Sequence, residues 1–286
     1  MTRENSWQGK VAIVTGGSSG IGEATAMALA EQGATVLVTG RDAARLADVA
    51  ARSGAIETVQ ADSADPTSAA RIVDAALSRW GRLDLIVNNA GAGQPLPIES
   101  YDMAVIANIC AVNITAPSML VKEGRAALGE TRGAVVNIGT AVSRNAAPQL
   151  AHYAATKAAL EHLTRSWAIE LAGDGIRVNA VSPGPVKSGA LTGMMGLPEE
   201  VAQAIETQEE AQIPLGRRGI PADIVPWILR LGGADSEWLT GQVLTVDGGQ
   251  RFRNRIYAAL ESEEEIHYAA LTKHLGRHVE PMKPKQ

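Results

Sequence analysis

The chain has 286 residues, of which 45% are hydrophobic and 20% are charged. These fractions are typical of a soluble globular protein and exclude a disordered chain, a coiled coil and a collagen-like fibre. The net charge is −5, so there is no broad basic face to neutralise the phosphates of a nucleic acid. We therefore expect a globular protein that does not bind nucleic acid.

Cysteine usage and the N-terminal segment indicate the cellular setting. Cys110 is the single cysteine and cannot form an intramolecular disulfide. The opening residues, MTREN, do not form a basic and then apolar leader, and no run reaches the ~18 consecutive apolar residues of a membrane span. The five histidines show no metal-ligand spacing. These features predict a cytoplasmic protein without a membrane segment or a metal.

Short apolar runs alternate with longer alanine-rich stretches of helical pattern. The apolar runs predict strands at 11–14, 36–38, 85–87, 134–136, 178–181 and 243–246. The helical stretches cover 20–32, 42–53, 66–79, 100–128, 150–172 and 221–232. Strands that alternate with helices predict a doubly wound α/β fold, with helices on both faces of a parallel sheet.

The domain organisation follows from where the alternation of strand and helix patterns ends. No repeat, low-complexity tract or Pro/Ser-rich linker divides the chain, so residues 1–250 are predicted to form one domain. Strand patterns are missing between Val186 and Arg218, where an acidic helical stretch runs over 199–210, and we expect a substrate lid at about 187–215. Residues 251–286 form a C-terminal extension with partly helical spacing, predicted to pack as a helix on a neighbouring subunit or near the lid.

A glycine-rich loop follows the first strand. The segment TGGSSGIG at 15–22 opens the first helix, with glycines at positions 16, 20 and 22. Glycines permit a tight turn and a close approach of the backbone, and a helix N-terminus presents free N–H groups to a pyrophosphate. The sequence therefore predicts a dinucleotide-binding loop.

Three further motifs agree with this loop: NNAG at 88–91, SPGPVKS at 182–188 and VDGG at 246–249. Together with the GxxxGxG spacing, they make residues 8–250 resemble the short-chain dehydrogenase/reductase family. The resemblance implies a Rossmann fold with a seven-stranded parallel sheet, and an NAD(H) or NADP(H) cofactor. It also implies that Asp62 contacts adenine, and that the Val186 backbone and the Ser188 hydroxyl meet the nicotinamide carboxamide. The predicted cofactor-binding residues are Gly16, Ser18, Ser19, Gly20, Ile21, Gly22, Arg41, Asp62, Ser63, Asn89, Ala90, Gly91, Tyr153, Lys157, Pro183, Gly184, Val186 and Ser188.

The end of the second strand indicates which cofactor is preferred. Gly40 occupies the position where NAD-preferring relatives carry an acid for the adenosine ribose, and Arg41 follows. A guanidinium suits the 2′-phosphate of NADP. Ser18 and Ser19 lack the basic residue that many NADP-dependent relatives place in the glycine loop, and Arg41 can also be read as a solvated loop charge. We expect NADP(H) to be preferred over NAD(H).

Tyr153 and Lys157 form a YxxxK pair, and their spacing places both on one face of the helix predicted over 150–172. A lysine beside the phenol is expected to lower its pKa and allow proton transfer near neutrality. The resemblance implies that Tyr153 exchanges a proton with the substrate oxygen while hydride moves at the nicotinamide C4, and that Lys157 also holds the ribose hydroxyls. His152, one residue earlier, points about 100° away on a helix and is not assigned a role.

Two more residues complete the predicted catalytic group. The family carries a serine in an Asn-Ile-Ser-Ser context thirteen residues before the tyrosine, whereas this sequence reads Asn137-Ile138-Gly139-Thr140. Thr140 keeps a hydroxyl that can donate to an oxyanion, and Ser143 is the competing hydroxyl. Asn113 matches the helix asparagine that holds a water behind the lysine in the family; a structural amide is the alternative.

These features predict an NADP(H)-dependent oxidoreductase that reduces a ketone or ketoacyl-type carbonyl to an alcohol, or catalyses the reverse. Two alternatives stay open: a related reductase acting on an imine or a secondary-metabolite intermediate, and a cofactor-binding regulatory protein with weakened catalysis. The expected partners are a small-molecule substrate and further copies of the chain in a homotetramer or homodimer, because the family assembles through its two long helices.

Overall fold

The computed structural model describes residues 6–252, and its centre is a parallel sheet. Within these residues seven strands lie in the order β3-β2-β1-β4-β5-β6-β7. All neighbouring strands pair in parallel. The strands are β1 (Val11–Thr15), β2 (Thr35–Gly40), β3 (Ile56–Gln60), β4 (Leu85–Asn88), β5 (Ala134–Ile138), β6 (Arg177–Pro183) and β7 (Val243–Val246). The predicted doubly wound α/β fold is confirmed.

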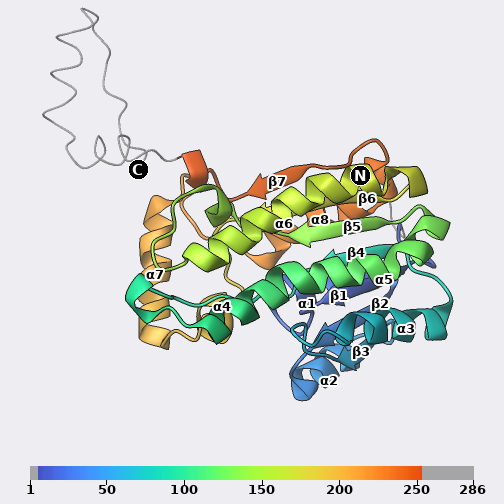
Figure 1. Ribbon diagram of the computed structural model, residues 1–286, viewed down its shortest axis with the longest axis horizontal. Coiled ribbons are helices and arrows are strands. Elements are labelled where there is room, and N and C mark those ends of the chain that lie inside the picture. The colour runs from blue at the N-terminus through green and yellow to red at the C-terminus, as the bar shows by residue number, and fades with distance from the viewer. Residues whose placement is uncertain (1–5, 253–286) are drawn as a thin grey trace, which may run out of the picture.

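Helices cover both faces of the sheet (Figure 1). On one face α1 (Gly20–Glu31), α2 (Ala43–Ala51) and α8 (Pro221–Gly232) enclose a core cluster with one side of the strands. On the other face α3 (Ser68–Trp80), α5 (Ala116–Thr131) and α6 (Ala151–Glu170) enclose a second cluster. Because both faces are covered, β1 is buried at every position, and its first four residues are apolar, as expected for a parallel sheet.

The long helix predicted over 100–128 is interrupted. It consists of α4 (Met103–Cys110), one π-helical turn (Ala111–Thr115) and α5. Asp102 sets the start, because its carboxylate accepts the N–H groups of Ala104 and Val105, both at 2.9 Å. A single π-turn inside a helix is often found at a functional site. Here it contains Asn113.

This continuous helical segment, Met103–Thr131, is the one described helix that is long and apolar enough to span a membrane by length and composition. Its mean hydropathy reaches 1.7 over 18 residues. Two of its apolar side chains, Leu120 and Leu128, are buried in the core against the sheet. Core helices commonly combine such length and composition. The cytoplasmic location expected from the sequence stays a prediction.

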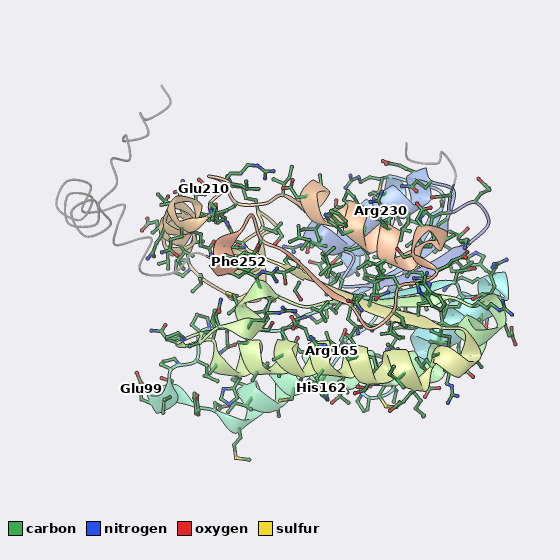
Figure 2. The ribbon with its side chains drawn as sticks, turned by 90° about the horizontal axis from the view of Figure 1, so that it is seen from above. Glu99, His162, Arg165, Glu210, Arg230 and Phe252 are labelled. Atoms are coloured by element: carbon green, nitrogen blue, oxygen red, sulfur yellow. The ribbon has the colours of Figure 1, made fainter. Side chains whose placement is uncertain are left out.

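The segment predicted as a lid contains α7 (Glu199–Gln212), preceded by a π-helical turn, Ala190–Met194. In Figure 1 the strands β5 and β7 point toward the end of the molecule where α4 and α7 lie. Figure 2 places Glu99, just before α4, and Glu210 of α7 toward this same end, far from Arg230 of α8. The segment therefore lies where strand ends and their loops gather. The predicted C-terminal helix, from residue 253 onward, lies outside the described residues.

Candidate active site

Two loops meet where the strand order reverses, between β1 and β4. The crevice beyond the carboxyl ends of such strands is where doubly wound folds bind ligands. Asn89 joins the loops, because its Nδ2 donates to the carbonyl oxygens of Thr15 and Gly16, both at 2.9 Å. Thr15 Oγ1 accepts the N–H groups of Asn89 and Ala90, both at 3.0 Å. The glycine loop and the NNAG motif are therefore bonded together as one unit.

The N-terminus of α1 provides an anion site. Its N-cap residue, Ser19, makes no side-chain capping hydrogen bond, so the first N–H groups of the helix lack a side-chain acceptor. These groups and the helix dipole favour a pyrophosphate. Gly20 has a φ of +57°, and a Cβ there would lie 2.9 Å from the Ser188 carbonyl oxygen. The residues present thus fit a dinucleotide whose phosphates lie against the loop.

The residues predicted to meet the adenosine of the cofactor lie after β2 and β3. Gly40 ends β2, and a Cβ at this position would lie 3.0 Å from Ser18 Oγ of the glycine loop. The Arg41 side chain follows and is exposed. Asp62, after β3, is also exposed, and its Oδ1 accepts the N–H of Ala64 at 2.9 Å. Position 40 is a glycine, so no carboxylate lies at the end of β2. The exposed Arg41 guanidinium can therefore reach a ligand bound at this edge of the sheet.

The other predicted cofactor residues lie along the same edge of the sheet. Ile21 packs against the core beneath α1, and Ser63 lines a hollow together with Ala90. Pro183 ends β6, and the N–H of Gly184 donates to the Val246 carbonyl oxygen of β7 at 2.9 Å. The SPG motif therefore carries the chain from β6 across the end of β7 toward the lid.

Tyr153 and Lys157 lie on the first two turns of α6. The side chain of Thr140, which follows β5, interacts with the Tyr153 phenol and favours its ionised form. Lys157 is buried, and its Nζ donates to the Ile138 carbonyl oxygen at 2.8 Å. An ammonium carries three protons, so this bond leaves two for other acceptors. Tyr153 and Lys157 thus share α6, while Thr140 and the Lys157 partner Ile138 lie at the end of β5.

Burial controls the titration of this pair. The pKa of Tyr153 is raised, because the loss of solvation outweighs the hydrogen bond from Thr140. Burial also lowers the pKa of Lys157 to about 8. The prediction that Lys157 lowers the pKa of Tyr153 is therefore wrong for this structure. The lysine extends to Ile138, at the end of β5, and desolvation dominates both groups.

Asn113 uses its amide fully on the protein. Its Oδ1 accepts the N–H of Ala92 at 2.9 Å, and its Nδ2 donates to the Ala92 carbonyl oxygen at 2.8 Å and to Thr156 Oγ1 at 2.9 Å. A Cβ at Gly91 would lie 3.7 Å from Asn113 Oδ1 and 3.6 Å from Lys157 Nζ. The amide oxygen therefore borders the same space as the ammonium, while both amide protons hold the loop and the helix.

Two residues that the sequence analysis did not single out also shape the site. Gly93 lies against the tyrosine ring, because a Cβ there would be 2.6 Å from Tyr153 Cδ2. Glu161 is buried and receives the Ser143 hydroxyl at 2.8 Å, so Ser143 is directed to this carboxylate. The spacing of Glu161, four residues after Lys157 on one helix, could have identified it as a neighbour of the site. Nothing in the sequence pattern around Gly93 indicated that it lies against the Tyr153 ring. The His152 ring instead packs edge-on against Tyr101, with 4.6 Å between centroids.

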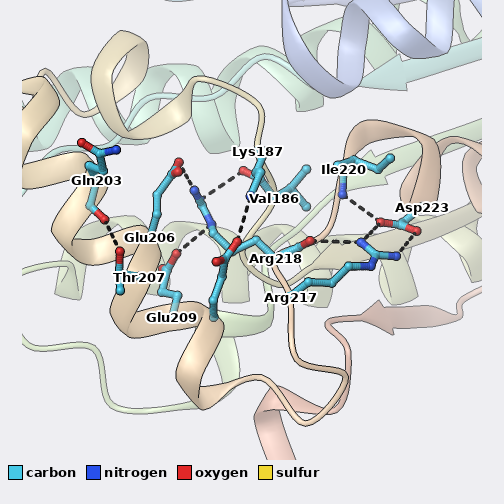
Figure 3. A network of polar contacts seen from close by, with 11 residues as sticks. Val186, Lys187, Gln203, Glu206, Thr207, Glu209, Arg217, Arg218, Ile220 and Asp223 are labelled. Atoms are coloured by element: carbon cyan, nitrogen blue, oxygen red, sulfur yellow. Dashed lines mark hydrogen bonds and ion pairs between the residues drawn. The ribbon is translucent and has the colours of Figure 1, made fainter.

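The segment predicted as a lid is joined to the residues after β6 by charged side chains (Figure 3). Arg218 is only 4% exposed, and it pairs with Glu206 and with Glu209 of α7, where Nε lies 3.0 Å from Oε2. The same guanidinium donates to the Val186 carbonyl oxygen at 3.2 Å. Burial raises the pKa of Glu209, and the charge of Arg218 opposes this effect. A second tie joins Lys187 Nζ to Glu210 at 2.8 Å.

One apolar side chain of the predicted lid lies near Gly91 and Lys157. Met194, in the π-turn before α7, has its Sδ 3.8 Å from the position of a Cβ at Gly91. Leu191 and Leu197 are partly buried, whereas Val201 is 44% exposed.

Within residues 6–252 no group of three or more His, Cys, Asp or Glu side chains could hold a metal ion. The site thus combines a dinucleotide crevice, a phenol-ammonium pair and an apolar cover.

Comparison with known proteins agrees with this geometry. Residues 16–251 match the family model described as enoyl-(acyl carrier protein) reductase. A rhamnolipid biosynthesis 3-oxoacyl-[acyl-carrier-protein] reductase from Pseudomonas aeruginosa is 36% identical over 250 residues, which cover 84% of this chain and 96% of the relative.

Solved structures give the same result. A short-chain dehydrogenase/reductase of unknown function from Caenorhabditis elegans, with cofactor, has a TM-score of 0.83 and 33% identity, over 88% of this chain and 99% of its own. A 3-ketoacyl-(acyl-carrier-protein) reductase from Brucella melitensis complexed with NADH has a TM-score of 0.79 and 31% identity, over 85% and 99% of the two chains. The chain therefore belongs to the short-chain dehydrogenase/reductase family of NAD(P)-dependent enzymes.

Proposed function

We propose that the protein is an NADP(H)-dependent oxidoreductase that reduces the carbonyl of a ketone or ketoacyl-type compound to an alcohol, or catalyses the reverse. The observation that carries the proposal is that Tyr153 and the buried Lys157 share α6, with the Thr140 side chain interacting with the Tyr153 phenol. The bound nicotinamide supplies or accepts a hydride at the carbonyl carbon. Tyr153 gives a proton to the carbonyl oxygen, so that one hydride and one proton convert the ketone to the alcohol.

The neighbouring groups support that proton transfer. The Thr140 hydroxyl stabilises the charge that develops on the substrate oxygen. The two Lys157 protons not used by Ile138 would be available to the ribose hydroxyls of the cofactor. Asn113 keeps the loop at Ala92 in place and offers its amide oxygen toward the same space. In the reverse direction the phenolate removes the alcohol proton.

A preference for NADP(H) is supported by the end of β2. Gly40 offers no carboxylate to a ribose 2′-hydroxyl, and the exposed Arg41 guanidinium can pair with a 2′-phosphate. Ser18 Oγ lies beside Gly40 and can donate to the same phosphate.

A medium-sized, mainly apolar carbonyl compound fits the lid. Met194 borders the catalytic space with a flexible thioether, which adapts to varied apolar shapes. The similar proteins named above include 3-oxoacyl- and 3-ketoacyl-(acyl-carrier-protein) reductases, which favours a ketoacyl-type substrate.

The test is oxidation of NADPH, and separately of NADH, across a panel of 3-oxoacyl thioesters, cyclic ketones and aldehydes. We expect turnover with NADPH, loss of turnover in Tyr153→Phe, and a larger loss in Thr140→Ala than in Thr140→Ser. The control is NADPH binding by fluorescence, which Tyr153→Phe should leave intact. Turnover that persists in Tyr153→Phe would contradict the mechanism.

Assembly into a homodimer or homotetramer is supported by apolar side chains exposed along the α4 and α6 side. Ile98, Met103 and Ile169 are 79%, 89% and 78% exposed. Exposed apolar groups on helices of this kind favour contact with a second copy. Light scattering after size exclusion would measure the mass, and Met103→Glu should shift it toward the monomer.

A further inference from the structure

A buried carboxylate lies behind the catalytic group. Glu161 of α6 is 4% exposed and follows Lys157 by one turn and Tyr153 by two, so the three side chains share one face of the helix. Burying a carboxylate is costly unless its oxygens have partners. The partners of Glu161 therefore indicate what the residue does.

Glu161 receives hydrogen bonds from two other elements. Its Oε1 accepts the Ser143 hydroxyl at 2.8 Å, from the turn after β5, and the Ser182 hydroxyl at 2.7 Å, from β6. Its Oε2 lies 3.5 Å from Nε of Arg144. One carboxylate thus joins α6 to the ends of β5 and β6.

Each serine leads to a different part of the site. Ser143 Oγ lies 2.7 Å from the Thr140 carbonyl oxygen, and the Ser143 N–H donates to that oxygen at 3.2 Å. Ser143 therefore anchors the turn that presents the Thr140 hydroxyl to Tyr153. Ser182 immediately precedes Pro183 and Gly184, which the sequence analysis predicts to bind the cofactor. The carboxylate is thus connected both to the hydroxyl donor and to the cofactor segment.

Gly139 makes room for this arrangement. A Cβ at position 139 would lie 2.4 Å from Ser182 Oγ and 3.3 Å from Glu161 Oε1. A side chain there would displace the Ser182 hydroxyl from the carboxylate. Gly139 and Glu161 therefore act together in this chain.

We propose that Glu161 is a positioning residue that sets the Thr140 hydroxyl and the nicotinamide segment relative to Tyr153, through Ser143 and Ser182. This inference rests on the function proposed above for Tyr153 and Thr140. Glu161 does not touch the reacting atoms.

Two substitutions of Glu161 separate hydrogen bonding from packing. Glu161→Gln keeps an oxygen that accepts both serine hydroxyls, and we expect most of kcat to remain. Glu161→Leu keeps the volume but removes the acceptor, and we expect kcat to fall at least about tenfold. The matched control is Thr164→Val, which removes a buried hydrogen bond of the same helix, from Asn137 at 2.9 Å, and should leave kcat unchanged. An unchanged kcat in folded Glu161→Leu, or an equal loss in the Gln and Leu variants, would overturn the proposal.

The two serines test the two connections separately, and they carry the test if Glu161→Leu fails to fold. Ser143→Ala should lower kcat with little effect on NADPH affinity. Ser182→Ala should weaken NADPH binding more than it lowers kcat. Serine variants that both match the wild type would overturn the proposal.

A spectroscopic readout separates this inference from the proposed function. The hydrogen bond from Thr140 lowers the pKa of Tyr153. Tyrosinate absorbance, taken as the difference from Tyr153→Phe, should therefore titrate at higher pH in Glu161→Leu and as wild type in Glu161→Gln. If this shift occurs while the wild type reduces no carbonyl, the proposed function fails and the positioning role stands. If the wild type is active and the titration does not move, the positioning role fails.

Discussion

Replacing Gly93 by alanine tests where the Tyr153 ring must lie. The backbone of Gly93 is outside the left-handed region, so alanine adds no backbone strain, but its Cβ would be 2.6 Å from Tyr153 Cδ2. Carbon atoms in contact prefer about 3.5 Å, so the ring or the loop must yield by about 0.9 Å. The loop is held, because Ala92 makes two hydrogen bonds with Asn113 at 2.9 and 2.8 Å.

The ring therefore moves, and its hydroxyl leaves Thr140. A displacement of about 1 Å at a catalytic group costs about 100-fold in rate, so we expect kcat of Gly93→Ala to fall by about that factor. The assay is steady-state NADPH oxidation with the best ketone, together with NADPH affinity and the thermal midpoint, both expected to stay near wild type. Gly173→Ala is the control, because a Cβ there meets nothing within 4 Å. A Gly93→Ala enzyme with wild-type kcat would refute the reasoning.

Three further predictions concern the cofactor, the lid and the buried lysine. Gly40→Asp places a carboxylate beside the proposed 2′-phosphate, and kcat/KM for NADPH relative to NADH should fall by about 10- to 100-fold; an unchanged ratio contradicts the assignment of Arg41. Arg218→Met removes the buried partner of two acids of α7, Glu206 and Glu209. We expect it to raise KM more than it lowers kcat, and to make proteolysis of α7 faster. The control Arg217→Met, which removes the partner of Asp223 at 2.7 Å, should change neither. Burial lowers the pKa of Lys157 from 10.5 to about 8, so the unfolded chain binds more protons between these values. The wild type should gain about 3 kcal/mol of unfolding free energy relative to Lys157→Met as the pH rises across this range, as measured by denaturant titration; a constant difference contradicts it.

The strands buried on both faces were predictable, because each contains a short run of mainly apolar residues. β3 gave no such signal, since Ile56 alone is buried in this edge strand and the remaining four residues face solvent or the rim. The π-turn at Ala111–Thr115 was not predictable, because its sequence, AVNIT, contains no proline or glycine to mark a change in the helix. Local patterns thus identified the elements whose burial repeats regularly and missed those at an edge or a single irregular turn.

The same distinction applies to the site. Motif residues such as Tyr153 and Lys157 could be identified from spacing alone, but spacing specifies a shared helix face and not where a side chain ends. The Lys157 ammonium reaches Ile138 on β5, so the expected effect on the Tyr153 pKa is replaced by desolvation. Gly93 matters through a contact with a residue sixty positions away, which only the folded chain reveals.

The departure from the family pattern at Gly139-Thr140 is the feature that made weakened catalysis a serious alternative. Two contacts argue against that alternative. The Thr140 side chain interacts with the Tyr153 phenol and favours its ionised form, so the added methyl has not separated the two groups. The turn that carries Thr140 is anchored by the hydrogen bond from Ser143 to the buried Glu161 carboxylate. A side chain at position 139 would displace Ser182 from that carboxylate. The two substitutions are therefore coupled: Gly139 admits the Glu161 contacts, and these hold Thr140 in the orientation that proton donation from Tyr153 requires.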